Sequence, residues 1–155
     1  MNWEEIAIRL GVALLLGSAI GLERQWRSRY VGLRTNTLLT IGSASMMIFA
    51  LMLPTNGDPA GLVHIVAGII TGVGFLGAGV IVKEGVTVKG FNTAATLWCS
   101  VAVGLFTGAG FFPAAVILTG FIVLVNLFLR PIVYYINEKT AASDSVEPGG
   151  RDAAD

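Results

Sequence analysis

Charged residues are scarce in this sequence: Lys, Arg, Asp and Glu make up 13% of its 155 residues, whereas soluble domains have about 25%. Ten basic and ten acidic residues give a formal net charge of zero, so no excess of positive charge points to nucleic acid, and we expect no nucleic-acid partner. Hydrophobic residues reach 54%, and the mean hydropathy is +0.76. Low charge and high hydropathy together indicate a membrane protein.

Cysteine and histidine are also nearly absent, because the chain has one of each, Cys99 and His64. A single cysteine excludes an intramolecular disulfide, and the two residues alone cannot form a zinc site or a catalytic triad. No Asp or Glu lies in the middle of an apolar run, so the carboxylates that divalent cations prefer are missing there. We therefore expect a protein that is not an enzyme, with no catalytic residues, no metal site and no cofactor.

Long apolar stretches are what the sequence does contain. A bilayer core about 30 Å thick needs about 20 apolar residues per helix, and five such stretches are present, at residues 3–22, 35–53, 61–82, 91–109 and 113–130. The sequence thus predicts an all-α membrane domain over residues 1–136 with about five transmembrane helices. The remaining residues, 137–155, are mostly small and polar and are predicted to form a disordered cytoplasmic tail.

Basic residues are distributed unevenly between the predicted loops. Nine of the ten Lys and Arg residues lie outside the interior of the apolar runs, in the loops after the first and third helices and at the C-terminal end, where Arg130 closes the last run. The positive-inside rule therefore predicts an external N-terminus and a cytoplasmic C-terminus. The one basic residue in the interior of a run is Arg9, which we expect to pair with Glu5 one helical turn earlier.

Glycines recur at helical spacing on the first, third and fourth predicted helices. Small residues let helix backbones approach closely, so we expect these glycines to form helix contacts, either within one subunit or between subunits. Because twofold pairing is the commonest assembly, we expect a homodimer. The predicted packing glycines are Gly17, Gly21, Gly68, Gly72, Gly79, Gly104 and Gly108.

Polar side chains gather in residues 83–100, where a charged segment precedes the fourth predicted helix. Asn92, Thr93, Thr96 and Ser100 fall on one face of that helix at the helical period, and Asn92 is predicted to be its N-cap. Two uses of this polar stripe remain open. It forms hydrogen bonds to neighbouring helices, or it lines a functional surface such as an ion path.

The predicted orientation brings several polar residues to the cytoplasmic interface, where we expect a functional polar layer. The arginines there are typical topology determinants that also hold anionic lipid; the alternative is a docking patch for a protein. The predicted layer comprises Glu23, Arg24, Arg34, Thr35, Glu84, Asn92, Thr93, Thr96 and Cys99.

Three segments of the sequence together resemble the MgtC/SapB family of small bacterial membrane proteins. They are GLER at residues 21–24, GLRT at residues 32–35, and FLGAG at residues 75–79, which continues to GFNTAATLWC at residues 90–99. The resemblance covers nearly all of residues 1–136, and Phe91 replaces an expected leucine. Many members add a soluble C-terminal domain, and we expect only the transmembrane domain here.

The resemblance implies a helical domain of about five spans in the bacterial inner membrane. It also implies a non-enzymatic regulatory role linked to magnesium homeostasis under limitation, to virulence and to intracellular survival. By the same resemblance, the partners are membrane lipid and another membrane complex such as the F-type ATP synthase, and Glu84, Asn92 and Cys99 match important positions. The alternative is a magnesium or other cation transporter or channel, whose path the polar stripe of the fourth helix would line.

Overall fold

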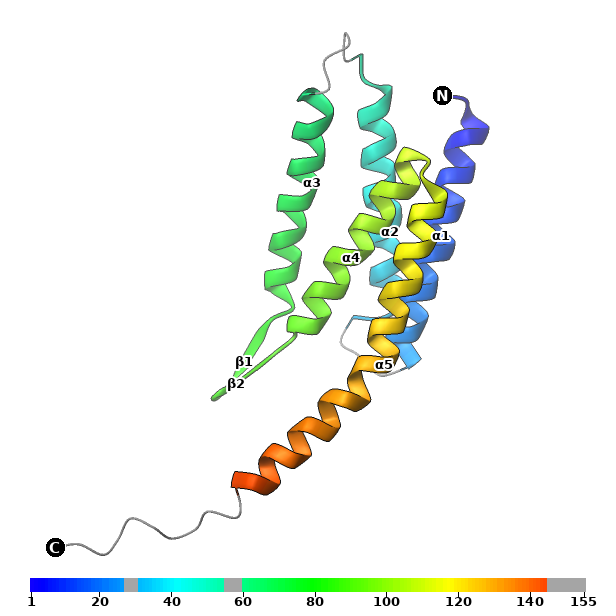
Figure 1. The fold of residues 1–155 in the computed structure, drawn as a ribbon. Helices are drawn as coiled ribbons and strands as arrows, with labels where there is room; N and C mark the ends of the chain where they lie inside the picture. Colours follow the sequence, from blue (N-terminus) through cyan, green and yellow to red (C-terminus); the bar gives the residue numbers. More distant parts are fainter. Residues whose placement is uncertain (27–30, 55–59, 145–155) are drawn as a thin grey trace, which may run out of the picture. The chain divides into compact units, whose positions relative to one another are not determined.

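The computed structural model describes residues 1–26, 31–54 and 60–144, with only the backbone described for residues 130–144. The chain divides into two compact units, of which the first is Met1–Ile122 and the second begins at Val123. The elements are α1 (Trp3–Trp26), α2 (Leu33–Met52), α3 (Ala60–Gly79), β1 (Val82–Glu84), β2 (Thr87–Lys89), α4 (Phe91–Ala109) and α5 (Phe112–Asp144) (Figure 1).

Among the described helices, four are long and apolar enough to cross a membrane: α1, α2, α3 and the Phe112–Leu129 part of α5. The chain is therefore an all-α membrane protein, as the sequence predicts. α4 is not among these four, although it carries no charged residue. It contains one amide, several hydroxyl groups and two glycines among its apolar residues. α4 follows strand β2 and leads to the start of α5 (Figure 1).

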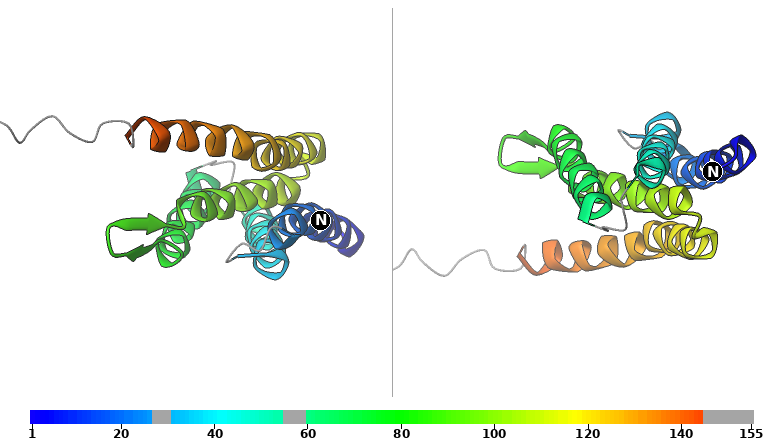
Figure 2. Two further views of the ribbon diagram at one scale, coloured as in Figure 1. Left: turned by 90° about the horizontal axis from the view of Figure 1, so that it is seen from below. Right: turned by 90° about the horizontal axis from the view of Figure 1, so that it is seen from above.

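α4 is enclosed by its neighbours in the first unit. It contacts α1, α2 and α3, and views along the helices show it between α1 and α2 on one side and residues 112–122 of α5 on the other (Figure 2). One cluster of the apolar core here comprises Ile20, Val103, Ala115 and Ile122. Because α4 is covered on several sides, its polar residues do not have to face lipid.

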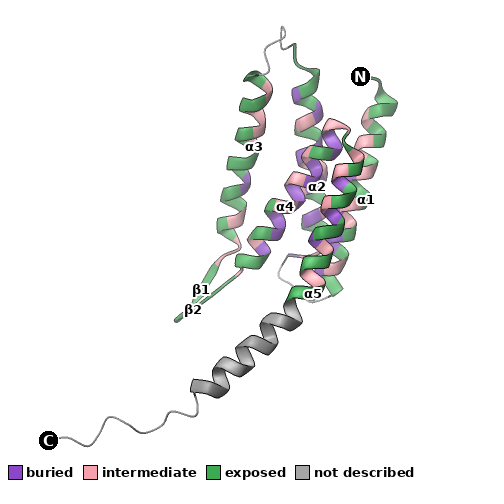
Figure 3. Cartoon of the chain, viewed as in Figure 1, coloured by how far each residue is buried: buried purple, intermediate pink, exposed green. Residues whose placement is uncertain are grey.

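α3 is much more open than α4. Val73 is its one buried residue, and most of the helix is exposed (Figure 3). In a protein that spans a membrane, such a surface faces lipid or another membrane protein. α3 therefore contributes little to the core of this chain and much to its outer surface.

The charged segment after α3, predicted as a loop, forms an antiparallel β-hairpin instead. Val82 pairs with Lys89, and Glu84 pairs with Thr87, which leaves a two-residue turn. Gly85 is the first residue of that turn and has φ +61°, as two-residue hairpin loops require. Both strands are exposed.

The N-cap of α4 is Gly90, so the predicted N-cap at Asn92 is wrong. Gly90 has φ +101° and makes no side-chain cap hydrogen bond, and any side chain at this position would overlap the carbonyl of Val80. The tight exit from the hairpin therefore requires glycine. Asn92 is an exposed residue in the first turn. Its backbone carbonyl accepts a 2.8 Å hydrogen bond from the hydroxyl of Thr96.

α5 extends beyond the predicted fifth span. The sequence predicts a span at residues 113–130 and a disordered tail at residues 137–155, but the helix continues to Asp144. The rest of the predicted tail, residues 145–155, lies outside the described residues.

Candidate functional site

A buried arginine connects α1 to α4. Arg24 lies in the last turn of α1 and is 2% exposed. Its Nη2 atom donates a 2.7 Å hydrogen bond to Oγ1 of Thr93, in the first turn of α4. A buried charge is costly unless it is hydrogen-bonded, so this contact offsets part of the cost of enclosing the guanidinium. The structure thus brings together two residues of the predicted polar layer.

Polar side chains of α2 meet the polar stripe of α4 further along the helices. Asn36 is fully buried; its Nδ2 atom donates to the Gly32 carbonyl at 2.9 Å, and its Oδ1 atom accepts from the Ser100 hydroxyl at 2.9 Å. The hydroxyl of Thr40 lies 3.2 Å from the Ser100 carbonyl and 2.9 Å from the Asn36 carbonyl. These contacts join α2 to α4 through polar atoms inside the bundle.

We call these buried polar residues the polar seam. The sequence analysis does not predict two of its six residues, Asn36 and Thr40, although they and Ser43 follow one another at helical spacing in α2. Their periodicity is the same signal that reveals the stripe on α4. The polar seam comprises Arg24, Asn36, Thr40, Thr93, Thr96 and Ser100.

Arg9 binds the opposite end of α4. Its Nη1 atom donates to the carbonyl of Gly108 at 2.6 Å, close to the C-terminal end of α4, where the helix dipole is negative. The guanidinium also lies beside Gly110, since a Cβ atom there would be 3.2 Å from Nη2. The predicted pair with Glu5 is wrong, because Glu5 is exposed and forms no ion pair with any described residue.

Two predicted packing glycines lie where α1 meets α2. A Cβ atom at Gly17 would be 2.8 Å from Cβ of Thr40, and one at Gly21 would be 2.6 Å from Cα of Leu33. Contacts this short leave no room for a side chain. Both glycines therefore serve a close approach inside one chain.

Two more packing glycines lie where α4 meets α2. A Cβ atom at Gly108 would be 2.5 Å from the carbonyl oxygen of Ala44. At Gly104 it would overlap the hydroxyl of Ser43 and the carbonyl of Thr40. Glycine in this part of α4 lets the backbone of α2 come close, and the polar seam lies along the same contact.

The predicted packing glycines of α3 are open instead. No heavy atom lies within 4 Å of a Cβ built at Gly68, Gly72 or Gly79, and all three are exposed. They make no close helix contact within the described part of this chain.

The other members of the predicted polar layer lie apart from one another. Glu84 pairs with Lys89 across the hairpin, and both side chains are about half exposed. Glu23 is half-buried beside Arg24 in α1. Cys99 is half-buried at the edge of the polar stripe on α4, where it packs against the apolar core. The predicted layer is therefore not one cluster.

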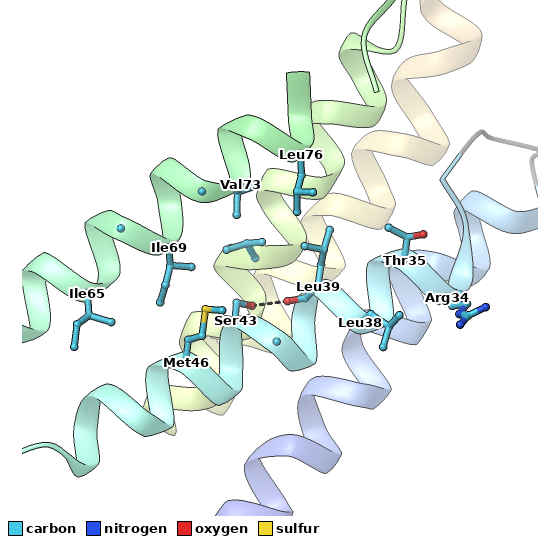
Figure 4. Close-up of a pocket in the computed structure, with 14 residues that line it drawn as sticks. Arg34, Thr35, Leu38, Leu39, Ser43, Met46, Ile65, Ile69, Val73 and Leu76 are labelled. Carbon is cyan, nitrogen blue, oxygen red and sulfur yellow. Dashed lines mark hydrogen bonds between the residues drawn. The ribbon is translucent and has the colours of Figure 1, made fainter. Parts of the chain in front are cut away.

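Arg34 and Thr35 line a separate feature, the α2–α3 groove (Figure 4). It has a volume of about 680 Å³. Among the side chains that line it, those of Arg34, Thr35 and Ser43 are polar. The remainder are mostly aliphatic and include Leu38, Leu39, Met46, Ile65, Ile69 and Leu76. The described residues that line it include no acid, thiol or imidazole.

Comparison with known proteins places this chain among named relatives. The model described as "MgtC family" matches residues 10–135. An uncharacterized protein of Synechocystis sp. is 48% identical over 147 residues, which cover 95% of this chain and 62% of that protein. Two proteins named "Protein MgtC" are each 44% identical. The one from Brucella abortus aligns over 151 residues (96% of this chain, 62% of the relative), and the one from Salmonella paratyphi A over 138 (89% and 58%).

The chain spans about three fifths of the length of these curated relatives. No solved structure matches it.

Proposed function

This chain belongs to the MgtC family, and from that membership we propose that it is a non-enzymatic regulatory protein of the bacterial inner membrane. It crosses the membrane several times, with its N-terminus outside and its C-terminus in the cytoplasm. It acts by binding another membrane complex, such as the F-type ATP synthase, when magnesium is limiting. Its activity contributes to virulence or to survival inside host cells.

The observation that carries this proposal is the use of the polar stripe on α4. Thr93 accepts a hydrogen bond from Arg24 of α1, and Ser100 donates to Asn36 of α2. An ion path needs polar groups that face an open passage, whereas these groups face neighbouring helices. The arrangement therefore supports a protein that binds over one that transports a cation.

α3 offers a surface for a membrane partner. Four small residues follow one another on one side of this helix at helical spacing, and all four are exposed. Another helix can approach such a face closely, because small side chains do not hold the backbones apart. We call it the small-residue face; it comprises Ala67, Thr71, Gly74 and Ala78. A second copy of the chain could use the same face to form a homodimer.

The test is photocrosslinking in native membranes. A photoreactive amino acid at Thr71 should capture another membrane protein, whereas the same amino acid at Leu15, which is 66% exposed on α1, should not. The mass of the crosslinked product distinguishes a different protein from a second copy.

Cation flux in liposomes made from the purified protein provides the opposing measurement. The proposal predicts no flux above that of protein-free liposomes. If Thr71 captures no membrane partner, and flux is present and falls when Asn92 and Thr96 are replaced by apolar residues, the protein is a transporter and the regulatory proposal is wrong.

A further inference from the structure

The α2–α3 groove has a cationic end and an apolar body. Arg34 and Thr35 lie at the end where α2 begins, and Met46 and Ile65 lie at the other (Figure 4). Between the two ends Ser43 is the one lining residue with a polar side chain, and its hydroxyl already donates to a carbonyl of its own helix at 2.8 Å. A molecule that fills this groove must therefore be mostly hydrocarbon and carry its polar group at one end.

The groups at the cationic end are available to a ligand. Arg34 and Thr35 are exposed, and neither side chain forms a hydrogen bond or ion pair with any residue that the structure describes. The N-cap of α2, Gly32, provides no side-chain hydrogen bond, so the first N–H groups of the helix lack a capping side chain. A guanidinium, a hydroxyl and a helix N-terminus at one place favour a phosphate group.

The length of the groove matches one leaflet of a bilayer. From Arg34 to Met46 the helix advances twelve residues, which is about 18 Å at about 1.5 Å per residue. Half of a hydrocarbon core of about 30 Å is about 15 Å. An acyl chain whose headgroup lies at Arg34 would therefore follow the groove to about the centre of the membrane.

Glycines on both walls leave space for such a chain. No heavy atom lies within 4 Å of a Cβ built at Gly42 of α2, or at Gly68 and Gly72 of α3. All three residues line the groove. The space that side chains would occupy at these positions is thus open to methylene groups of a ligand.

We propose that the α2–α3 groove is a binding site for an anionic phospholipid. One acyl chain lies between the two helices, and the phosphate binds Arg34, Thr35 and the N-terminus of α2. Any exposed apolar helix touches lipid in a membrane; this groove differs because it selects the charge of the headgroup. The inference does not depend on the proposed regulatory role or on its partner.

A lipid titration of the purified full chain in mild detergent, followed by native mass spectrometry, tests the headgroup preference. Phosphatidylglycerol and phosphatidylcholine are the two probes. The unaltered protein should retain one phosphatidylglycerol more tightly than phosphatidylcholine. Arg34→Gln should weaken phosphatidylglycerol binding about fivefold, since one basic side chain near anionic lipid contributes about 1 kcal/mol. The control Lys83→Gln removes an exposed charge from the hairpin and should leave the affinity unchanged.

Filling the groove tests the site of the acyl chain. Gly68→Leu and Gly72→Leu should each abolish the retained phosphatidylglycerol. The matched control is Gly11→Leu, because Gly11 is exposed on α1 with no heavy atom within 4 Å of its built Cβ, and this variant should bind like the unaltered protein. Circular dichroism of each variant checks that its helices are intact. Glycerol 3-phosphate, which has the headgroup phosphate without acyl chains, should not compete.

Three results would overturn the proposal. The first is equal retention of the two phospholipids, or phosphatidylglycerol binding that Arg34→Gln and both glycine variants leave unchanged. The second is phosphatidylglycerol binding that Arg34→Gln weakens while neither glycine variant changes it. Competition by glycerol 3-phosphate would have the same meaning, because either result would identify a surface anion site. The third is a dimer that Gly72→Leu converts to a monomer without altering lipid retention, because a second copy would then fill the groove.

Discussion

Arg24 and Thr93 are 69 residues apart in sequence, yet Nη2 of the arginine donates a 2.7 Å hydrogen bond to Oγ1 of the threonine. The contact joins the end of α1 to the beginning of α4. Because Arg24 is 2% exposed, water cannot readily replace Thr93 as the acceptor. The junction of these two helices therefore depends in part on one hydroxyl group.

Replacing Thr93 with valine should lower the free energy of unfolding by about 1–3 kcal/mol, because the substitution removes an acceptor from a buried charged donor. Unfolding of the purified protein in detergent measures the change. Thr93→Ser keeps the hydroxyl and should recover most of the stability. The control is Thr71→Val on α3, where the exposed hydroxyl bonds only to its own helix. Equal stability of Thr93→Val and the unaltered protein would contradict the prediction.

Asn36 and Ser100 should show an energetic coupling in a double-mutant cycle. Asn36→Leu and Ser100→Ala each remove the 2.9 Å hydrogen bond between the two side chains, so the double variant should lose less stability than the sum of the single losses. Hydrogen bonds between membrane helices average about 0.6 kcal/mol, which is the coupling we expect. Asn36→Leu should lower the free energy of unfolding more than Ser100→Ala does, because it also removes the hydrogen bond to the Gly32 carbonyl. Strictly additive losses would mean that this bond contributes nothing.

Gly104→Ala should destabilise the protein, since the added methyl group would overlap the hydroxyl of Ser43 and the carbonyl of Thr40. Overpacking of a tight contact typically costs about 1–3 kcal/mol. Gly11→Ala is the matched control: no heavy atom lies within 4 Å of its built Cβ, so better helix propensity should stabilise that variant by up to about 1 kcal/mol. Thermal unfolding of the two variants should shift in opposite directions, and shifts in the same direction would count against the close contact of α2 with α4.

Arg9→Gln should lower stability by about 0.3–2 kcal/mol, the range for a cation at a helix C-terminus. Its 2.6 Å hydrogen bond to the Gly108 carbonyl explains the loss. Glu5→Gln should change stability by less than about 0.5 kcal/mol, as surface substitutions do. Unfolding curves of both variants decide between this contact and the pair that the sequence predicts. If Arg9→Gln and Glu5→Gln lower the free energy of unfolding by the same amount, Arg9 acts through Glu5 and the prediction is wrong.

Helical periodicity predicts part of the polar seam and misses the rest. Thr93, Thr96 and Ser100 recur at helical spacing in an otherwise apolar helix, so the stripe on α4 is evident from the sequence. Asn36 and Thr40 obey the same rule, but α2 also carries Thr35, Thr37 and Ser45 on its other sides, so its polar stripe stands out less clearly. Which residues of the two stripes meet depends on how the helices pack, and helical periodicity alone does not specify that packing.

Glycine spacing predicts where helices can come close, but not where they do. Gly104 and Gly68 lie in similar small-residue patterns, yet Gly104 is covered by α2 and Gly68 is open. The difference lies in the neighbouring helix and not in the glycine itself. The N-cap of α4 is mispredicted for a related reason, since a side-chain cap at Asn92 assumes a loop before the helix, whereas the hairpin ends in a left-handed turn at Gly90.

The enclosed position of α4 has a consequence for how the protein is made. This helix pairs its polar side with α1 and α2, which precede it in the chain, so a ribosome delivers both of them to the membrane before α4 emerges. Polar side chains reduce the tendency of a lone segment to leave the insertion machinery for lipid. Arg24 and Asn36 are then already in the bilayer to receive Thr93 and Ser100. The order of the helices along the chain is thus also a workable order of assembly.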